Sequence, residues 1–310
     1  QKSKGRESQQ FKDDSSFGEW QVVFDFKKTI FVGYENSEIS SEVVKYRNNN
    51  EKVEVVCKKT PFYAEAGGQV GDTGEIKSDQ IHLLVEDTYK IGDDICHLCS
   101  IKSGSLNLLD KNNKVKLSIN KSRREKIKLN HTGTHLLHKA LKKVLGKHVQ
   151  QAGSLVSDAK LRFDLTHYEK ISSDDIVKIE AIVNEVVMKN SKLEISEQNF
   201  EKAKKNGAEA LFGEKYEDIV RVVDIDEFSK ELCGGTHVDR TGDIGSFKIV
   251  SESSLASGVR RIEAVTGHAA LDLAENNYNI VNYFKSKFQC VESEIKNKID
   301  DLSDIVKENE

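Results

Sequence analysis

Hydrophobic and polar residues alternate in short runs from Trp20 to about Ile119, which is the period-two pattern of half-buried β-strands. Four runs carry the pattern most clearly: "WQVVFDF", "KVEVVCK", "QIHLLVED" and "KVKLSIN". Clusters of Gly, Asn and Asp separate the runs, and short strands at this spacing are typical of a small β-barrel or sandwich. We therefore expect a β-barrel domain over residues 21–120. Residues 1–20 are polar and lack a period, so we interpret them as a linker or a frayed helix.

The pattern becomes helical at Ser122. Ser122 and Glu125 have the spacing of a capping box, which is a common start of a helix. The helical pattern continues to about Leu145, and Gly146 is a natural C-terminal stop.

Helices and strands are mixed in the next part of the chain. A helix is predicted over 173–190, with Ser172 as its cap, and a shorter one over about 197–206. Strands are expected at "DIVRVVDI", "IGSFKIV" and "RRIEAVT". Because these elements do not alternate regularly, we predict an α+β core over residues 121–268.

The chain is predicted to be helical from about Ala269 to its end, as an extension over residues 269–310. The apolar residues there are spaced by four and three, with one irregular step: Phe284, Phe288, Val291, Ile295, Ile299, Leu302 and Val306. This spacing fits either the start of a coiled coil or an ordinary amphipathic helix.

Composition narrows the class of protein. The 310 residues are 37% hydrophobic, which is enough for buried cores, and no apolar run approaches the roughly 18 residues of a membrane span. The five cysteines are odd in number and scattered, which favours a reducing compartment, and we expect a cytoplasmic protein. The chain begins at Gln1 and its one methionine is Met188, so we expect it to be a piece of a longer protein.

A glycine-rich segment lies within the predicted barrel. In "TPFYAEAGGQVGDTGEI", four glycines fall within eight residues: Gly67, Gly68, Gly71 and Gly74. Glycines at this density fit either a sharp corner of the barrel or a surface that another molecule approaches closely.

Two pairs of residues indicate a metal site. His131 and His135 are four apart on the predicted helix, so their imidazoles lie on one face. Cys233 and His237 are also four apart, in a glycine loop that can fold back on itself. Three imidazoles and one thiolate best match a single zinc ion. His138 lies on nearly the same helix face and competes with them as a ligand.

Other chemistries have weaker support. "CHLC" at Cys96–Cys99 has CxxC spacing but lies in a strand pattern, where the two side chains point to opposite faces. A zinc peptidase is disfavoured, because Thr132 stands where the HExxH motif has its glutamate. We find no Ser-His-Asp elbow and no GxxxxGK phosphate loop in the sequence.

The helix that carries the histidines is strongly basic. Residues 121–147 contain nine Lys or Arg and one acid, Glu125, in a chain whose net charge is -4. This stretch is either a solvated helix face or a surface that guides an anionic partner to the metal. Arg260 and Arg261, beside a glycine in "GVRRIEA", are a second candidate phosphate contact.

These motifs resemble a known family. "NHTGTHLLHKALKKVLGKHVQQAGSLVSDAKLRFDLTHYE", "GAEALFGEKY", "ELCGGTHV" and "GVRRIEAVTG" resemble the editing domain of alanyl-tRNA synthetases, and "TPFYAEAGGQVGDTG" resembles the β-barrel that precedes it. The likeness covers roughly residues 25–270. Nothing in the sequence resembles the aminoacylation module, so we expect an internal fragment. Free-standing alanyl-tRNA editing proteins share the same core and are the alternative.

The resemblance implies an aminoacyl-tRNA ester hydrolase that clears serine or glycine from alanine-specific tRNA, and the rest of a synthetase chain as a partner. It implies that His131, His135, Cys233 and His237 bind one zinc ion, and that Gln151 lines the editing pocket. Thr134 can offer a hydroxyl to a serine substrate or can simply pack in its helix. Lys142 and Lys143, with Arg260 and Arg261, are the candidate tRNA contacts.

Two positions depart from the family. Gly133 replaces the usual Ala, at a cost of about 1 kcal/mol in a helix interior. Leu165 replaces an aromatic residue, which we interpret as a packing change.

The mechanism is left open by the sequence. Four protein ligands are typical of a structural zinc site, whereas hydrolysis by zinc-bound water needs an open position. We favour zinc as the organiser of the pocket. A non-catalytic tRNA-binding module with a structural zinc is the competing hypothesis.

Overall fold

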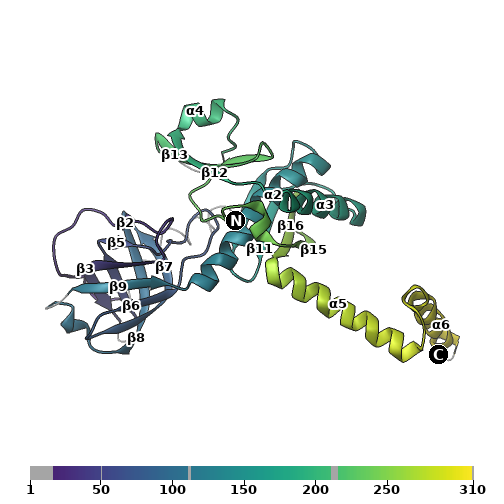
Figure 1. The fold of residues 1–310 in the computed structure, drawn as a ribbon, viewed down its shortest axis with the longest axis horizontal. Coiled ribbons are helices and arrows are strands. Elements are labelled where there is room, and N and C mark those ends of the chain that lie inside the picture. Colours follow the sequence, from purple (N-terminus) through teal and green to yellow (C-terminus); the bar gives the residue numbers. More distant parts are fainter. Residues whose placement is uncertain (1–16, 50, 111–112, 211–215, 309–310) are drawn as a thin grey trace.

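The computed structural model describes residues 17–49, 51–110, 113–210 and 216–308. Most of the predicted linker at 1–20, and residues 211–215 of the "GAEALFGEKY" motif, lie outside the described residues. Within them the protein has mixed α and β structure, as predicted (Figure 1).

The N-terminal part is a closed β-barrel of six antiparallel strands. Their order around the barrel is β3 (Glu38–Asn48), β4 (Val53–Cys57), β8 (Asp94–Ser103), β7 (His82–Ile91), β6 (Gly74–Lys77) and β9 (Lys114–Ile119), and β9 pairs again with β3 to close it. Valine, isoleucine and leucine side chains from alternate positions fill the interior, so the period-two pattern has the predicted meaning. Short pieces complete this part: β1 (Gln21–Val22) on β3, the parallel pair β2 (Ile30–Phe31) and β5 (Lys59–Thr60), and the 3-10 turn η1 (Leu106–Leu108).

One predicted barrel strand is much shorter than expected. In "WQVVFDF" only Gln21 and Val22 form a strand, and the backbone N–H groups of Val23 and Phe24 then both donate to the carbonyl of Val44. Phe24 and Phe26, together with Trp20, pack instead against a small cluster on the outside of the barrel wall. Their apolar character therefore reflects this outer packing and not a long strand.

The core that follows has a four-stranded antiparallel sheet covered by two helices. The sheet order is β10 (Gln151–Val156), β11 (Leu161–Thr166), β16 (Val259–Thr266) and β15 (Phe247–Ala256). Helices α2 (Lys121–Leu145) and α3 (Ser173–Lys189) share the main hydrophobic cluster with this sheet. The 3-10 turn η2 (Thr241–Ile244) lies against both helices.

A smaller sheet lies beside the core. It contains β12 (Glu194–Asn199), β13 (Ile219–Ile225) and β14 (Ser229–Leu232), with the short helix α4 (Phe200–Lys205) between the first two strands. The helix predicted over 197–206 therefore begins later than expected, because residues 194–199 pair with β13. Asn199 ends that strand and caps α4 through its side-chain oxygen.

Helix ends follow local hydrogen bonding. Asn120, and not Ser122, caps α2 by accepting a hydrogen bond from the backbone N–H of Arg123, so the predicted capping box is wrong by two residues. The stop at Gly146 and the cap of α3 by Ser172 are confirmed.

The C-terminal extension is two helices and not one. Helix α5 (Gly267–Phe288) ends at Gln289, whose left-handed backbone breaks the helix. The 3-10 turn η3 (Glu292–Glu294) and α6 (Ile295–Glu308) follow, and Figure 1 shows them at the far end of α5 from the core. The predicted apolar seam is therefore interrupted. None of the described helices has a stretch long and apolar enough for a transmembrane helix.

Candidate metal centre and adjoining pocket

The four predicted ligands come together in the structure. His131 and His135, one turn apart on α2, are buried beside Cys233 and His237 from the loop after β14, and the ligand atoms of all four lie within 4.8 Å of one another. Cys233 Sγ lies 3.4 Å from His131 Nε2 and 3.3 Å from His237 Nε2. Four ligands around a small tetrahedral ion, at bond lengths of about 2.0–2.3 Å, are separated by about 3.3–3.6 Å. The two separations from Cys233 Sγ fall in this range, and the four donors are close enough together for one ion to be held among them.

A second polar group faces the other nitrogen of each imidazole. Gln69 Oε1 lies 2.7 Å from His131 Nδ1, Thr132 Oγ1 lies 3.1 Å from His237 Nδ1, and Glu231 Oε2 lies 3.5 Å from His135 Nδ1. Such partners fix the orientation and tautomer of ligating histidines in metalloproteins. Here they hold Nε2 of His131 and His237 toward the thiol.

Burial favours the neutral form of His131 and His237. It lowers the pKa of His131 to about 4 and lowers the pKa of His237 well below its usual value, and the other nearby histidines add to the effect at His237. At Glu231, the neighbouring histidines outweigh the effect of burial on the pKa. Burial would raise the pKa of this carboxyl, but His135 and His138 lower it to about 2. Neutral imidazoles beside a thiol are the donor set that a borderline-soft divalent metal ion takes.

The glycines of "CGGTH" permit the close approach. A Cβ on Gly235 would lie 2.0 Å from His131 Cε1, so no larger residue fits there. Arg221 on β13 holds the same loop, because its Nη1 donates to the carbonyls of Cys233 and Gly235 at 2.8 and 2.9 Å. The ring of Tyr34 stacks on that guanidinium at 4.2 Å.

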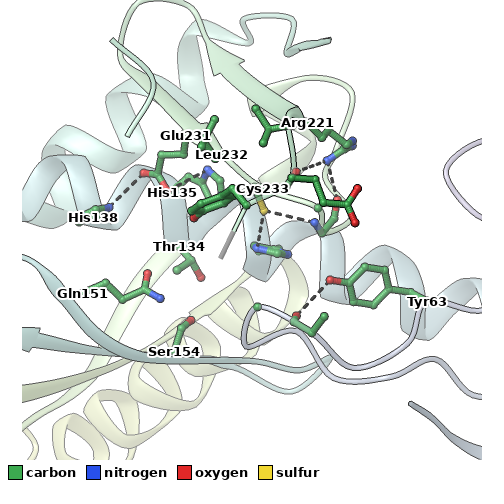
Figure 2. Close-up of a pocket in the computed structure, with 18 of the residues that line it drawn as sticks. Tyr63, Thr134, His135, His138, Gln151, Ser154, Arg221, Glu231, Leu232 and Cys233 are labelled. Carbon is green, nitrogen blue, oxygen red and sulfur yellow. Dashed lines mark hydrogen bonds and ion pairs between the residues drawn. The ribbon is translucent and has the colours of Figure 1, made fainter. Parts of the chain in front are cut away.

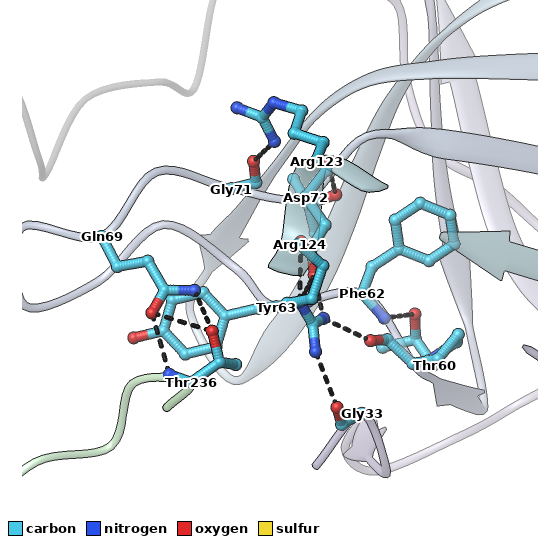
Figure 3. Close-up of polar contacts among 12 residues, drawn as sticks. Gly33, Thr60, Phe62, Tyr63, Gln69, Gly71, Asp72, Arg123, Arg124 and Thr236 are labelled. Atoms are coloured by element: carbon cyan, nitrogen blue, oxygen red, sulfur yellow. Dashed lines mark hydrogen bonds and ion pairs between the residues drawn. The ribbon is translucent and has the colours of Figure 1, made fainter. Parts of the chain in front are cut away.

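The glycine-rich segment of the barrel reaches the metal site. Gln69 is fully buried, and its Oε1 also accepts a hydrogen bond from the backbone N–H of Thr236, next to the ligand His237 (Figure 3). The chain at Gln69 pairs with Val156 of β10, and a Cβ on Gly68 would lie 2.8 Å from the Ser154 carbonyl. The close approach that the sequence allowed is therefore made by another part of the same chain.

A pocket of about 480 Å³ is lined by three of the four candidate ligands, His131, His135 and Cys233. Figure 2 shows Thr134, Gln151 and Ser154 on one side of it and Glu231 and Cys233 on another. Thr134 Oγ1 donates to the Asn130 carbonyl at 2.8 Å, so this hydroxyl is engaged within its helix. The side-chain amide of Gln151 has no hydrogen-bond partner among the described residues and is available to a ligand.

The predicted tRNA contacts all have partners within the chain. Lys142 forms an ion pair with Glu209, and Lys143 lies 4.2 Å from the centre of the Phe228 ring. Arg260 pairs with Glu252, and Arg261 makes a two-pronged ion pair with Asp164 at 2.7 and 2.8 Å.

His138 and the "CHLC" pair lie outside the group of four. Cys96 and Cys99 are buried in β8, in clusters on opposite faces of the barrel wall, as the strand pattern predicted. Burial raises the pKa of both thiols.

Sequence reasoning did not identify the supporting residues Gln69, Arg221 and Glu231. Each had a weak signal. Gln69 lies inside the glycine-rich motif, Glu231 is two residues before Cys233 in the chain, and Arg221 interrupts an apolar strand.

The chain matches the sequence models of two tRNA synthetase families. The model for the threonyl and alanyl tRNA synthetase second additional domain matches residues 220–263, and the model for class II (A) tRNA synthetases matches residues 1–123. The second match falls on the stretch that contains the barrel.

Alanine–tRNA ligases are among the curated proteins that are similar to this chain. The enzyme of Thermoanaerobacter sp. (strain X514) is 43% identical over 307 residues, covering 96% of this chain and 35% of the relative. The enzyme of Thermotoga maritima is 47% identical over 292 residues, covering 91% of this chain and 34% of the relative. The chain thus spans about a third of the length of these relatives.

Proposed function

The chain belongs to the alanyl-tRNA synthetase family, and from this premise we propose that it is a hydrolytic editing site that removes serine or glycine from mischarged alanine-specific tRNA. The observation that carries the proposal is the pocket. Three of the four clustered candidate ligands line this cavity, together with the available amide of Gln151 and the hydroxyl-bearing Thr134, and this supports the proposal. A synthetic site for alanine cannot exclude smaller glycine by size and rejects an added hydroxyl weakly, so a second, hydrolytic site supplies the missing discrimination.

We propose zinc as the metal. Three observations support it: the donor set of three imidazoles and one thiolate, the separations of 3.3–3.4 Å from Cys233 Sγ, and the lowered pKa values of His131 and His237. Bound zinc would supply positive charge that polarises a carbonyl and organises the pocket. Four protein ligands favour this organising role.

The residues that line the pocket have distinct proposed roles. The pocket excludes bulk water and holds the aminoacyl end, Gln151 hydrogen-bonds the substrate, and Thr134 faces the amino-acid side chain. The tRNA acceptor end is the proposed partner, and Lys142, Lys143, Arg260 and Arg261 remain candidate contacts. Each of them would have to exchange an intramolecular partner for a phosphate.

Deacylation of seryl-tRNA and glycyl-tRNA by the zinc-loaded chain tests the proposal. Cys233→Ala removes the thiolate and should lower both zinc content and the rate by at least about a hundredfold. Cys290→Ala, which removes a thiol remote from the site, should change neither. If the wild-type chain binds zinc and tRNA but leaves both esters intact, the non-catalytic tRNA-binding module is the correct hypothesis.

A further inference from the structure

His138 is a buried histidine of the pocket that the four-ligand group does not use. It lies one turn after the ligand His135 on α2, is 5% exposed, and lines the same cavity (Figure 2). Its ring packs against Phe163, with ring centres 5.2 Å apart. From the sequence, His138 was only a competing metal ligand, but in the structure it lies outside the group of four candidate ligands.

The two ring nitrogens of His138 differ sharply. Nδ1 lies 3.2 Å from Glu231 Oε1, which also accepts the Ser229 hydroxyl at 3.1 Å. A carboxylate oxygen accepts, so Nδ1 carries the proton and Nε2 carries the lone pair. Nε2 is buried and has no hydrogen-bond partner among the described residues.

A buried acceptor without a partner costs stability and calls for an explanation. If His138 served packing alone, an apolar side chain against Phe163 would avoid that cost. The arrangement of carboxylate, imidazole and free Nε2 is instead that of the histidine base in hydrolytic triads, where an acid fixes the tautomer and the orientation of the ring.

We propose that His138 is the general base of the editing reaction, with Glu231 as the residue that positions it. The inference rests on the proposed function and supplies the water-activating group. His138 Nε2 takes a proton from a water molecule as the water oxygen bonds to the ester carbonyl carbon. The tetrahedral intermediate then breaks its bond to the ribose oxygen, which receives the proton back from His138. The products are the free amino acid and a tRNA with its terminal hydroxyl restored.

Glu231 links this base to the metal centre. Its Oε1 faces His138 and its Oε2 lies 3.5 Å from Nδ1 of the ligand His135. One carboxylate therefore connects the proposed base to the candidate metal site, where a bound ion would supply positive charge that polarises the ester carbonyl.

The test is single-turnover deacylation of seryl-tRNA by the zinc-loaded chain. A general base contributes about 10²–10⁴-fold, so His138→Ala and His138→Gln should lower the rate by at least about a hundredfold with zinc content and tRNA affinity unchanged. His268→Gln, the same change at an exposed histidine of α5, should leave the rate unaltered.

Chemical rescue separates a catalytic role from a structural one. Added imidazole should raise the rate of His138→Ala by about tenfold or more, beyond its effect on seryl-tRNA without protein, and should not raise that of the wild-type chain. A rate for His138→Gln within about threefold of wild type overturns the inference. So does a rate loss that follows loss of zinc, or a His138→Ala rate that imidazole does not raise. In each case an active wild-type chain leaves the proposed function standing.

Discussion

His97 and His131 are both buried, yet their surroundings give them different roles. In the barrel, His97 Nδ1 donates to the Val55 carbonyl at 2.8 Å and Nε2 accepts from the Thr60 hydroxyl at 2.7 Å, so both nitrogens are satisfied. At His131 one nitrogen meets Gln69 and the other faces the Cys233 thiol. A satisfied ring holds a fold together, whereas a ring with one nitrogen directed at other donors is arranged for a metal.

The stability of the barrel should depend on pH through His97. Burial lowers its pKa to about 4, while in the unfolded chain it returns to about 6.5. The unfolded state then binds more protons between these values, so stability is lost as the pH falls below about 6.5. Between pH 7.5 and pH 5 this residue alone should cost the folded state about 2 kcal/mol.

Urea unfolding at the two pH values measures this effect. The drop in the free energy of unfolding should be about 2 kcal/mol smaller in His97→Gln than in the wild-type chain, and His268→Gln should behave as wild type. Equal drops in His97→Gln and wild type would mean that the protein does not hold His97 neutral.

The clustering of the four candidate ligands was predictable because the spacing within each pair is local. His131 and His135 are fixed by the helical repeat, and Cys233 and His237 by a glycine loop. Gln69 and Glu231 were not predictable. Their roles come from contacts across more than 60 residues of chain, which no local pattern encodes.

At the scale of elements, the glycine-rich turn is the most informative segment. It leaves the barrel and runs beside β10. The side chain of Gln69 in this segment contacts both His131 and the backbone of Thr236 in the loop after β14. A residue of the barrel segment thereby contacts the candidate metal site, so unfolding of the barrel is expected to lower the metal affinity of the core.

Gln69→Ala should lower zinc affinity by about 10–100-fold, the usual effect of removing a group that orients a ligand. Competition with a chromogenic chelator measures this directly. Gln80→Ala, in an exposed turn of the barrel, is the matched control. Unchanged affinity in Gln69→Ala would show that the helix and loop alone position the ligands.

The hydrophobic pattern of the chain indicates which positions are buried, but the charge pattern does not indicate which ion pairs form. The basic stretch of α2 reads as an anion-binding face, yet acids from other elements pair with much of it. Arg123 pairs with Asp158, and Lys139 and Lys142 with Glu209. Hydrophobic periodicity reports burial locally, whereas the partner of a charge can come from anywhere in the chain. The helix break at Gln289 was not predicted either, because the residues on both sides of it favour helix.

At the scale of the whole molecule, α2 joins the barrel to the core. Its first turns reach the barrel, where Arg124 is almost fully buried (Figure 3). The guanidinium pairs with Asp72 and donates to the carbonyls of Gly33 and Pro61 at 2.7 and 3.0 Å. Asp72 Oδ2 in turn accepts from the Tyr63 N–H at 2.7 Å. One side chain of the helix thus ties together three segments of the barrel.

Arg124→Met should therefore destabilise the protein by about 3–5 kcal/mol, because it leaves the carboxylate of Asp72 buried without its counter-charge. Denaturant unfolding, followed in parallel by far-ultraviolet circular dichroism and by zinc release, measures the loss. Adding Asp72→Asn removes the stranded charge and should restore part of the stability. Lys126→Ala, at an exposed position of the same helix, should stay within about 0.5 kcal/mol of wild type. If α2 is the link between the two units, the single variant should also separate the two signals, with zinc release no longer coinciding with loss of strand structure. A loss below about 1 kcal/mol, with coincident transitions, would place the link elsewhere, at the contact of Gln69 with the ligand loop.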